Sequence, residues 1–309
     1  MSEIQPAREP SFLAHIFLSP DGPRLRAGWR FALQILSLLF IGGCLSIPLF
    51  TILFLLDSSI IASFPQIKPE YLLLAMIAET LAVTLSVFLA RRFLDKMSIE
   101  SLGLKLSIQS LLDVLAGITI TLLQMGLIFL LMLQFGWSSF EGFAWEFDPF
   151  SVIMINTVLF LATFVLVAWS EELLSRGYHL QTIASGLNLF WGVVISSAIF
   201  GFLHLQNPGA TWVSTAGIFL AGILFAYAYI RTKQLWLPMG MHLGWNFFEG
   251  VVFGFPVSGL DIYALTRITI HGPELWTGGA FGPEAGLIVL PALLLGGWLI
   301  YLYTMRRTT

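Results

Sequence analysis

The residues that could do chemistry gather in three short stretches of an otherwise apolar chain. They read "EELLSR" from Glu171, "FGFLH" ending at His204, and "HLGWN" from His242. The first follows directly on a long apolar run, where a charge in lipid is costly unless it is paired or hydrated. The carboxylates therefore indicate either the end of a membrane span or a functional site inside it.

Helical spacing gives these residues an arrangement. Side chains four residues apart share a helix face, so Glu172 can pair with Arg176, and His242 lies over Asn246. Glu171 lies about 100° around the helix from Glu172, since a turn has 3.6 residues. One carboxylate is therefore free to face a cavity while its neighbour is held by the arginine.

This set of side chains is suited to hydrolysis. A desolvated carboxylate can act as a general base toward water. Two imidazoles can position that water, shuttle a proton or bind a metal, and an asparagine amide can donate hydrogen bonds to an oxyanion. No serine or cysteine has a matching base, because Cys44 lies far away in an early apolar run. Together the residues supply the parts of an amide-cleaving site.

The composition indicates the surroundings of this site. Of 309 residues, 57% are hydrophobic and only 11% are charged, whereas soluble domains have about 25% charged residues. The chain therefore belongs to the class of polytopic membrane proteins. A net charge of −3 offers no basic footprint, so we expect no nucleic-acid partner. The single cysteine permits no intramolecular disulfide, and no cleavable signal peptide is expected.

The apolar runs predict the elements that position the site. A spanning helix needs about 20 mainly apolar residues, which predicts an all-α protein with about eight transmembrane helices, at 27–56, 71–90, 108–134, 150–170, 187–204, 211–230, 237–256 and 285–304. We divide the chain into four parts. Residues 1–26 form a cytoplasmic N-terminal segment and 27–149 the N-terminal transmembrane helices. Residues 150–256 form the core that carries the three stretches, and 257–309 an outer loop with the final helix.

The positive charges predict the orientation. With the N-terminus inside, the outer loops contain only Lys68 and Arg267, so thirteen of the fifteen Lys and Arg residues are inner. The positive-inside rule then puts both termini in the cytoplasm. We expect a multi-pass integral protein of a bacterial inner (cytoplasmic) membrane.

The three stretches resemble the motifs of a known family. The chain is similar to the CPBP intramembrane proteases, also called the Abi or type II CAAX prenyl endopeptidase family, over residues 150–256. The family's motifs are EExxxR, FxxxH and HxxxN, and they match Glu171, Glu172 and Arg176, then Phe200 and His204, then His242 and Asn246.

The resemblance implies a role for each residue. Glu171 would be the base that activates water, and His204 would hold that water. His242 and Asn246 would stabilise the oxyanion, and Glu172 and Arg176 would hold the site in order. The implied reaction is CAAX-type cleavage near the C-terminus of a protein, prenylated on cysteine where the host makes such proteins, at a site open to the cytoplasm.

The cofactor remains open between two alternatives. Some descriptions of the family treat these residues as zinc ligands, for which Glu171, His204 and His242 are the candidates. The HExxH spacing of many zinc proteases is absent, and Asn246 is a poor zinc ligand but a good oxyanion donor. We therefore expect hydrolysis without a required metal, with zinc as the alternative. The expected partners are membrane lipid and a peptide or lipidated-protein substrate, and the oligomeric state is left open.

Other interpretations stay open beside this one. Each group alone has a structural explanation: an ion pair for Glu172 and Arg176, a helix-terminal hydrogen bond for His204, and a polar bridge between helices for the HxxxN pair. Their joint occurrence favours the site. A non-proteolytic membrane-binding or bacteriocin-immunity protein could keep the same residues. An ion-coupled transporter is a further alternative, although the inverted repeats typical of transporters are not evident.

Three further acidic residues lie in or near the spans. Glu79 is expected to be a structural partner for a backbone or hydroxyl group, Glu249 could line the same cavity, and Glu284 in "TGGAFGPEAG" receives no role.

A condition on depth must be met for the motifs to meet. If the helix of Glu171 ended there, His204 would lie roughly 20 Å away along the bundle, at 1.5 Å rise per residue. The helix must therefore continue to about residue 182. His204 must lie at mid-depth, with "LQNPGAT" as a non-helical break lining a cavity.

Overall fold

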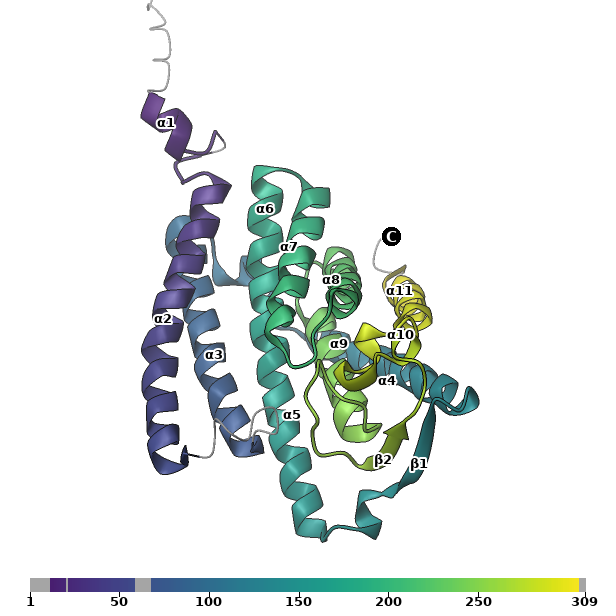
Figure 1. Ribbon diagram of the computed structural model, residues 1–309. Coiled ribbons are helices and arrows are strands. Elements are labelled where there is room, and N and C mark those ends of the chain that lie inside the picture. The colour runs from purple at the N-terminus through teal and green to yellow at the C-terminus, as the bar shows by residue number, and fades with distance from the viewer. Residues whose placement is uncertain (1–11, 21, 59–67, 306–309) are drawn as a thin grey trace, which may run out of the picture.

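The computed structural model describes residues 12–20, 22–58 and 68–305 (Figure 1). It is mostly helical, with a small sheet at one end. The helices are α1 (Phe12–Phe17), α2 (Ala27–Leu56), α3 (Pro69–Leu89), α4 (Ile108–Gln134), α5 (Phe150–Glu172), α6 (Gln181–Gly186), α7 (Leu189–Leu203), α8 (Trp212–Thr232), α9 (Trp236–Asn246), α10 (Glu274–Thr277) and α11 (Val289–Thr304), and the strands are β1 (Ser138–Phe143) and β2 (Thr266–Ile270).

Six helical segments of the described chain are long and apolar enough to cross a membrane. They are Ala27–Leu56, Pro69–Leu94, Ile108–Gln134, Phe150–Gly186, Leu189–Gln206 and Trp212–Thr232. α11 is apolar but shorter, and α9 has 11 residues before it continues as a π-helical turn, Phe247–Val252. The prediction of a helical integral membrane protein is confirmed, although two of the eight expected spans are shorter than the length rule requires.

The helix that carries the two adjacent glutamates continues past its predicted span, as the condition on depth requires. The expected span ended at residue 170, whereas α5 continues through a π-helical segment, Leu173–Leu180, into α6 and ends at Gly186. Figure 1 shows α5 and α6 as one continuous column. The charges do not end the helix because Arg176 pairs with Glu172 inside it, at 2.7 Å. π-helical turns inside α-helices are frequent at functional sites.

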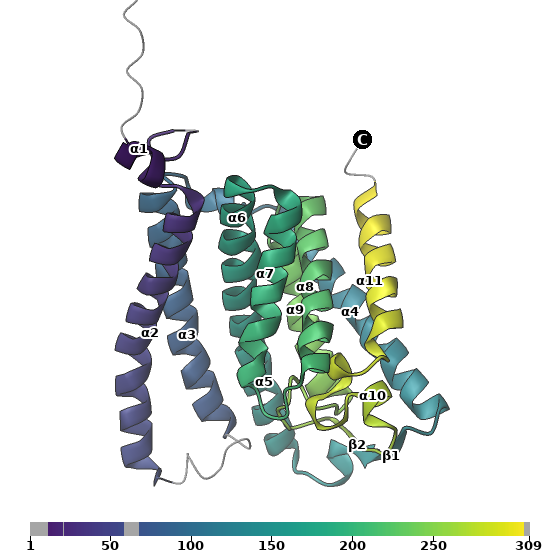
Figure 2. The same ribbon diagram turned by 45° about the horizontal axis from the view of Figure 1, so that its top comes forward.

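The all-α prediction misses one feature, a two-stranded antiparallel sheet. β1 pairs with β2, with Ser138 opposite Ile270 and Phe143 opposite Thr266. β2 reads "TRITI", and its β-branched residues favour strands. Figure 2 shows the sheet at the end of the bundle opposite to α1 and the C-terminal end of α11.

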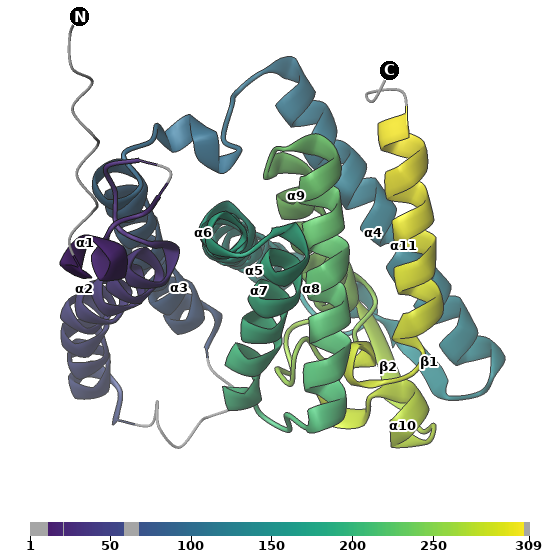
Figure 3. The same ribbon diagram turned by 90° about the horizontal axis from the view of Figure 1, so that it is seen from above.

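Close packing of α4 against α9 fixes the position of the HxxxN stretch. A Cβ built on Gly117 of α4 would lie 2.5 Å from the backbone nitrogen of Met241, and one on Gly240 of α9 would lie 2.3 Å from the carbonyl oxygen of Val114. Small residues allow membrane helices to approach this closely. Seen from above in Figure 3, α9 lies directly beside α4. His242 is therefore carried by a helix with little freedom to move.

Candidate active site

The two glutamates of α5 face different surroundings. Glu172 is fully buried, and its Oε1 accepts hydrogen bonds from Nη1 of Arg176 at 2.7 Å and from Nδ1 of His242 at 3.0 Å. Arg176 is buried too, donates from Nη2 to the carbonyl oxygen of Gly222 at 3.0 Å, and lies 4.4 Å from the centre of the Phe200 ring. The predicted i,i+4 ion pair is thus present. It anchors the imidazole of His242.

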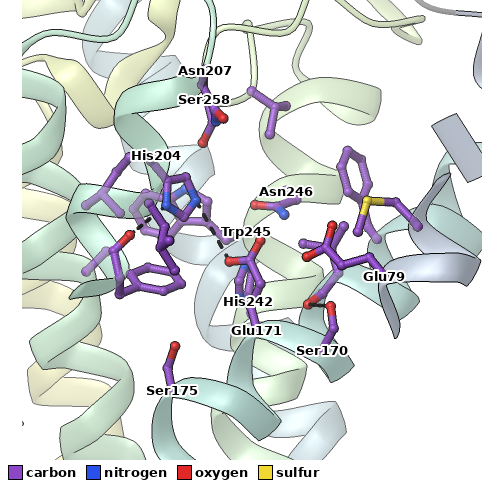
Figure 4. A pocket seen from close by; sticks show the side chains of 18 of the residues that line it. Glu79, Ser170, Glu171, Ser175, His204, Asn207, His242, Trp245, Asn246 and Ser258 are labelled. Carbon is purple, nitrogen blue, oxygen red and sulfur yellow. Dashed lines mark hydrogen bonds and ion pairs between the residues drawn. The ribbon is translucent and has the colours of Figure 1, made fainter. Parts of the chain in front are cut away.

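Glu171 faces both imidazoles. Its Oε2 lies 3.8 Å from Nε2 of His204 and 3.8 Å from Nε2 of His242 (Figure 4). His204 is fixed at its other ring nitrogen, because Nδ1 lies 2.8 Å from the carbonyl oxygen of Phe200. A distance of 3.8 Å is too long for a direct hydrogen bond but can be bridged by one water molecule.

A cavity of about 430 Å³ surrounds these atoms. Glu171, His204, His242 and Asn246 all line it, whereas Glu172 and Arg176 lie behind its wall. Asn246 is 7% exposed, makes no side-chain hydrogen bond with the described residues, and directs its amide into the cavity (Figure 4). The six predicted residues are thus brought together, four at the cavity surface and two in support. Their chemical roles stay predictions.

The condition on depth is met by the elements around the cavity. α5 and α6 continue 15 residues past Glu171 to Gly186. His204 lies at the C-terminal end of α7, and a 3-10 turn, His204–Gln206, leads into the irregular segment before α8. The end of α7 that carries His204 therefore lies beside Glu171, in the middle of the long α5–α6 segment.

The cavity lining reaches one end of the bundle. Its lining includes Gln206, Asn207, Ser258 and Leu260, which belong to connections at the end of the bundle that carries the sheet. None of the described residues at the opposite end, in 91–108, 181–188 or 231–236, lines it. Glu171 itself lies in the middle of a 37-residue helical segment, Phe150–Gly186.

Glu284, to which the sequence assigns no role, lines the cavity. Glu284 accepts hydrogen bonds from Nε1 of Trp245 at 3.0 Å and from the hydroxyl of Ser258 at 2.5 Å. Burial raises the pKa of Glu284, while the hydrogen bond from Ser258 and the nearness of His204 act in the opposite direction. Its partners Trp245 and Ser258 lie 39 and 26 residues away in the sequence, so local spacing carries no signal for these contacts.

The other two acidic residues also differ from expectation. Glu79 lines the cavity and makes no hydrogen bond with the described residues, in place of the structural partner that was expected. Glu249 is fully buried outside the lining, so the suggestion that it lines the cavity is wrong.

Glu171, His204 and His242 are the candidate ligands of a metal ion. The types of donor in Glu171, His204 and His242 suit zinc, and a second hydrogen bond at Nδ1 is usual for histidine ligands. Tetrahedral zinc, however, places its nitrogen and oxygen donors roughly 3.4 Å apart, and the Nε2–Oε2 distances here are 3.8 Å. Among the described residues no group of three or more His, Cys, Asp or Glu is arranged to hold a metal. The residues are therefore not preorganised as a zinc site.

Comparison with known proteins agrees with the motifs. Residues 153–248 match the family model described as type II CAAX prenyl endopeptidase Rce1-like. The family predicted from the motifs is therefore confirmed over this segment.

Two known proteins are similar to part of the chain. The chain is 28% identical over 97 residues to "Putative membrane peptidase YdiL" of Bacillus subtilis (strain 168), covering 31% of this chain and 38% of that protein. It is also 28% identical over 118 residues to "Cytochrome c oxidase subunit 3" of Aedes aegypti, covering 36% of this chain and 44% of that protein. Both matches span less than half of the relative's length.

Proposed function

Because residues 153–248 belong to the Rce1-like family of type II CAAX prenyl endopeptidases, we propose that the chain is an intramembrane endopeptidase that uses a glutamate-activated water. The observation that carries this proposal is the convergence of Nε2 of His204 and Nε2 of His242 on Oε2 of Glu171, at 3.8 Å each, in one cavity. A water molecule bridging these atoms would be held for attack on a peptide carbonyl.

The proposed reaction assigns each proton. The bound water donates one hydrogen bond to Glu171 and the other to Nε2 of His204, which leaves a lone pair for the carbonyl carbon. As the C–O bond forms, Glu171 takes a proton and the carbonyl oxygen becomes an oxyanion. The amide of Asn246 donates to that oxyanion, assisted by Nε2 of His242 when it carries a proton. Glu171 then returns its proton to the amine as the C–N bond breaks.

The supporting residues hold this geometry without touching the substrate. Glu172 orients His242 through Nδ1, and Arg176 neutralises Glu172. The carbonyl oxygen of Phe200 orients His204. Such second hydrogen bonds fix the ring orientation and the tautomer of a histidine.

The proposal extends to topology. We infer eight membrane crossings, with α9 and α11 as the two short ones, and both termini in the cytoplasm of a bacterial cell. The excess of inner Lys and Arg residues supports this orientation. So does the position of α1 and the C-terminal end of α11 at one end of the bundle (Figure 2). We take 150–256 as the core that carries the site. The family name implies C-terminal CAAX substrates, prenylated or not.

The test is peptide hydrolysis by the purified full chain in detergent, against a panel of lipidated and unlipidated peptides. Glu171→Gln should lower the rate by about 10²–10⁴-fold, as expected for the loss of a general base. Glu146→Gln is the matched control, because Glu146 is exposed and lies outside the cavity. Retention of more than half of the activity in Glu171→Gln would remove Glu171 as the base. A binding or immunity protein would show no hydrolysis at all.

A further inference from the structure

The cavity around the site has an acidic wall with no fixed basic partner. Three carboxylates line it, Glu79 from α3, Glu171 from α5 and Glu284 from the connection before α11. None of the described lining residues is Lys or Arg, and Arg176 is turned away to Glu172 and Gly222. His204 and His242 supply the only other ionisable groups of that lining. A ligand that enters this space therefore meets acceptors of hydrogen bonds and negative charge.

Glu284 is held in place by its backbone as well as its side chain. Gly278 and Gly282 have φ of +81° and +111°, which favour glycine. A Cβ on Gly217 of α8 would lie 1.9 Å from the carbonyl oxygen of Glu284, so the segment fits closely against that helix. The hydrogen bonds from Trp245 and Ser258 then fix both carboxylate oxygens. The carboxylate is thus a rigid part of the cavity wall.

Glu79 reaches the same space from a separate helix. It lies in the middle of α3, a candidate membrane span, and has no hydrogen-bond partner among the described residues. Figure 4 shows its carboxylate and that of Glu171 directed into one cavity from different helices. An ionisable residue inside a membrane normally faces a polar pathway or a ligand, because its desolvation is costly.

A further feature of the cavity indicates what kind of ligand enters. Asn246 is more than nine-tenths buried, is aimed into the cavity and lacks a side-chain partner among the described residues. Its amide atoms face the open cavity, where a ligand can complete their hydrogen bonds. A peptide backbone offers both the donors and the acceptors that this amide requires. The carboxylates therefore line a cavity that can hydrogen-bond a peptide backbone.

Building on the proposed peptidase function, we propose that Glu284 and Glu79 make the cavity select peptides with a cationic side chain beside the scissile bond, and disfavour a free carboxylate there. Opposite charge across a binding surface gives specificity, and like charge rejects the wrong partner. A C-a-a-X terminus carries a free carboxylate within three residues of its cysteine. Under this inference such termini, which the family name implies as substrates, bind less tightly than an internal basic segment.

Four acetylated peptides of one apolar sequence test the charge selection. Three are amidated and differ only in a central Lys, Gln or Glu, and the fourth has the Gln sequence with a free carboxylate three residues beyond the centre. Dissociation constants are measured for the full chain carrying Glu171→Gln in detergent, and kcat/KM for the wild-type chain. The Lys peptide should bind about tenfold more tightly than the Glu peptide and the free-carboxylate peptide.

Substitutions attribute the preference to particular residues. Glu284→Gln and Glu79→Gln should each reduce the Lys-to-Glu ratio by about threefold or more, whereas Glu146→Gln should leave the ratio unchanged. Equal affinity for all four peptides, or a ratio unaffected by both substitutions, would overturn the inference. If the preference holds but no peptide is cleaved, the charge selection stands and the peptidase proposal fails. If peptides are cleaved without a charge preference, the peptidase proposal stands and the charge selection fails.

Discussion

Glu172 shows how a single buried carboxylate can organise a site that it does not line. One oxygen accepts from both Arg176 and His242, at 2.7 and 3.0 Å. Burying an ion is costly, so each member of such a group depends on the others. The stability of the core and the orientation of a proposed catalytic imidazole are therefore linked through this one carboxylate.

Arg176→Met should destabilise the protein strongly. The substitution leaves Glu172 buried without its countercharge and removes the donor to Gly222, which typically costs about 3–5 kcal/mol. The measurement is the unfolding transition in detergent. Arg267→Met is the matched control: Arg267 pairs with Asp148 at 2.6 Å but its side chain is 38% exposed. An exposed pair contributes only about 0–1 kcal/mol. Equal effects of the two substitutions would show that burial of the Arg176 pair is unimportant.

Chelation of metals should leave hydrolysis intact. Glu171, His204 and His242 are the candidate ligands, and their donor atoms are spaced more widely than tetrahedral zinc requires. A carboxylate can act as base toward water without a metal. The measurement combines metal analysis of the active protein with activity after treatment with a chelator. Stoichiometric zinc, with activity lost to the chelator and restored by zinc, would contradict this expectation.

At the scale of elements, the sequence indicated which helices meet but not where each one ends. The i,i+4 spacing was sufficient to predict the pair of Glu172 with Arg176, because that contact is local. The apolar run predicts a span that ends at residue 170, and only the need for the motifs to meet predicts that the helix continues to about residue 182; α5 and α6 reach Gly186, with the ion pair of Glu172 and Arg176 inside the helix. Glu284 could not be found from its surroundings in sequence, since its partners Trp245 and Ser258 lie 39 and 26 residues away.

Gly117→Ala should disturb the site from a distance. The new methyl group would lie 2.5 Å from the backbone nitrogen of Met241 and 2.6 Å from the carbonyl oxygen of Leu237, so α9 must shift. Overpacking typically costs about 1–3 kcal/mol, and a shift of about 1 Å in a catalytic group can lower the rate about 10²-fold. The measurements are the unfolding transition and the rate of hydrolysis.

Gly126→Ala in the same helix is the control for this substitution. A Cβ there meets nothing within 4 Å. The substitution should preserve activity and raise stability by about 0.5–1 kcal/mol, since glycine is unfavourable inside a helix. Loss of activity in Gly126→Ala equal to that in Gly117→Ala would remove close packing as the cause.

At the scale of the whole molecule, the cavity and the termini lie toward opposite ends of the bundle. α1 and the C-terminal end of α11 share one end, and the sheet of β1 and β2 marks the other (Figure 2). The cavity lining reaches Asn207 and Ser258 at the sheet end. With both termini in the cytoplasm, the cavity would be nearer the outer face. In that orientation, the proposed substrates would be other than cytoplasmic prenylated C-termini.

Labelling of single cysteines in intact cells tests this sidedness. Cys44 is the sole native cysteine, so Cys44→Ser gives a background without thiols. Glu146→Cys places a thiol at the sheet end and Lys105→Cys places one at the opposite end, both at exposed positions. Because the inner segments hold the excess of positive charge, a maleimide that cannot cross membranes should label Glu146→Cys in intact cells. It should label Lys105→Cys only after the cells are permeabilised. The reverse pattern would turn the cavity toward the cytoplasm and make C-terminal substrates accessible again.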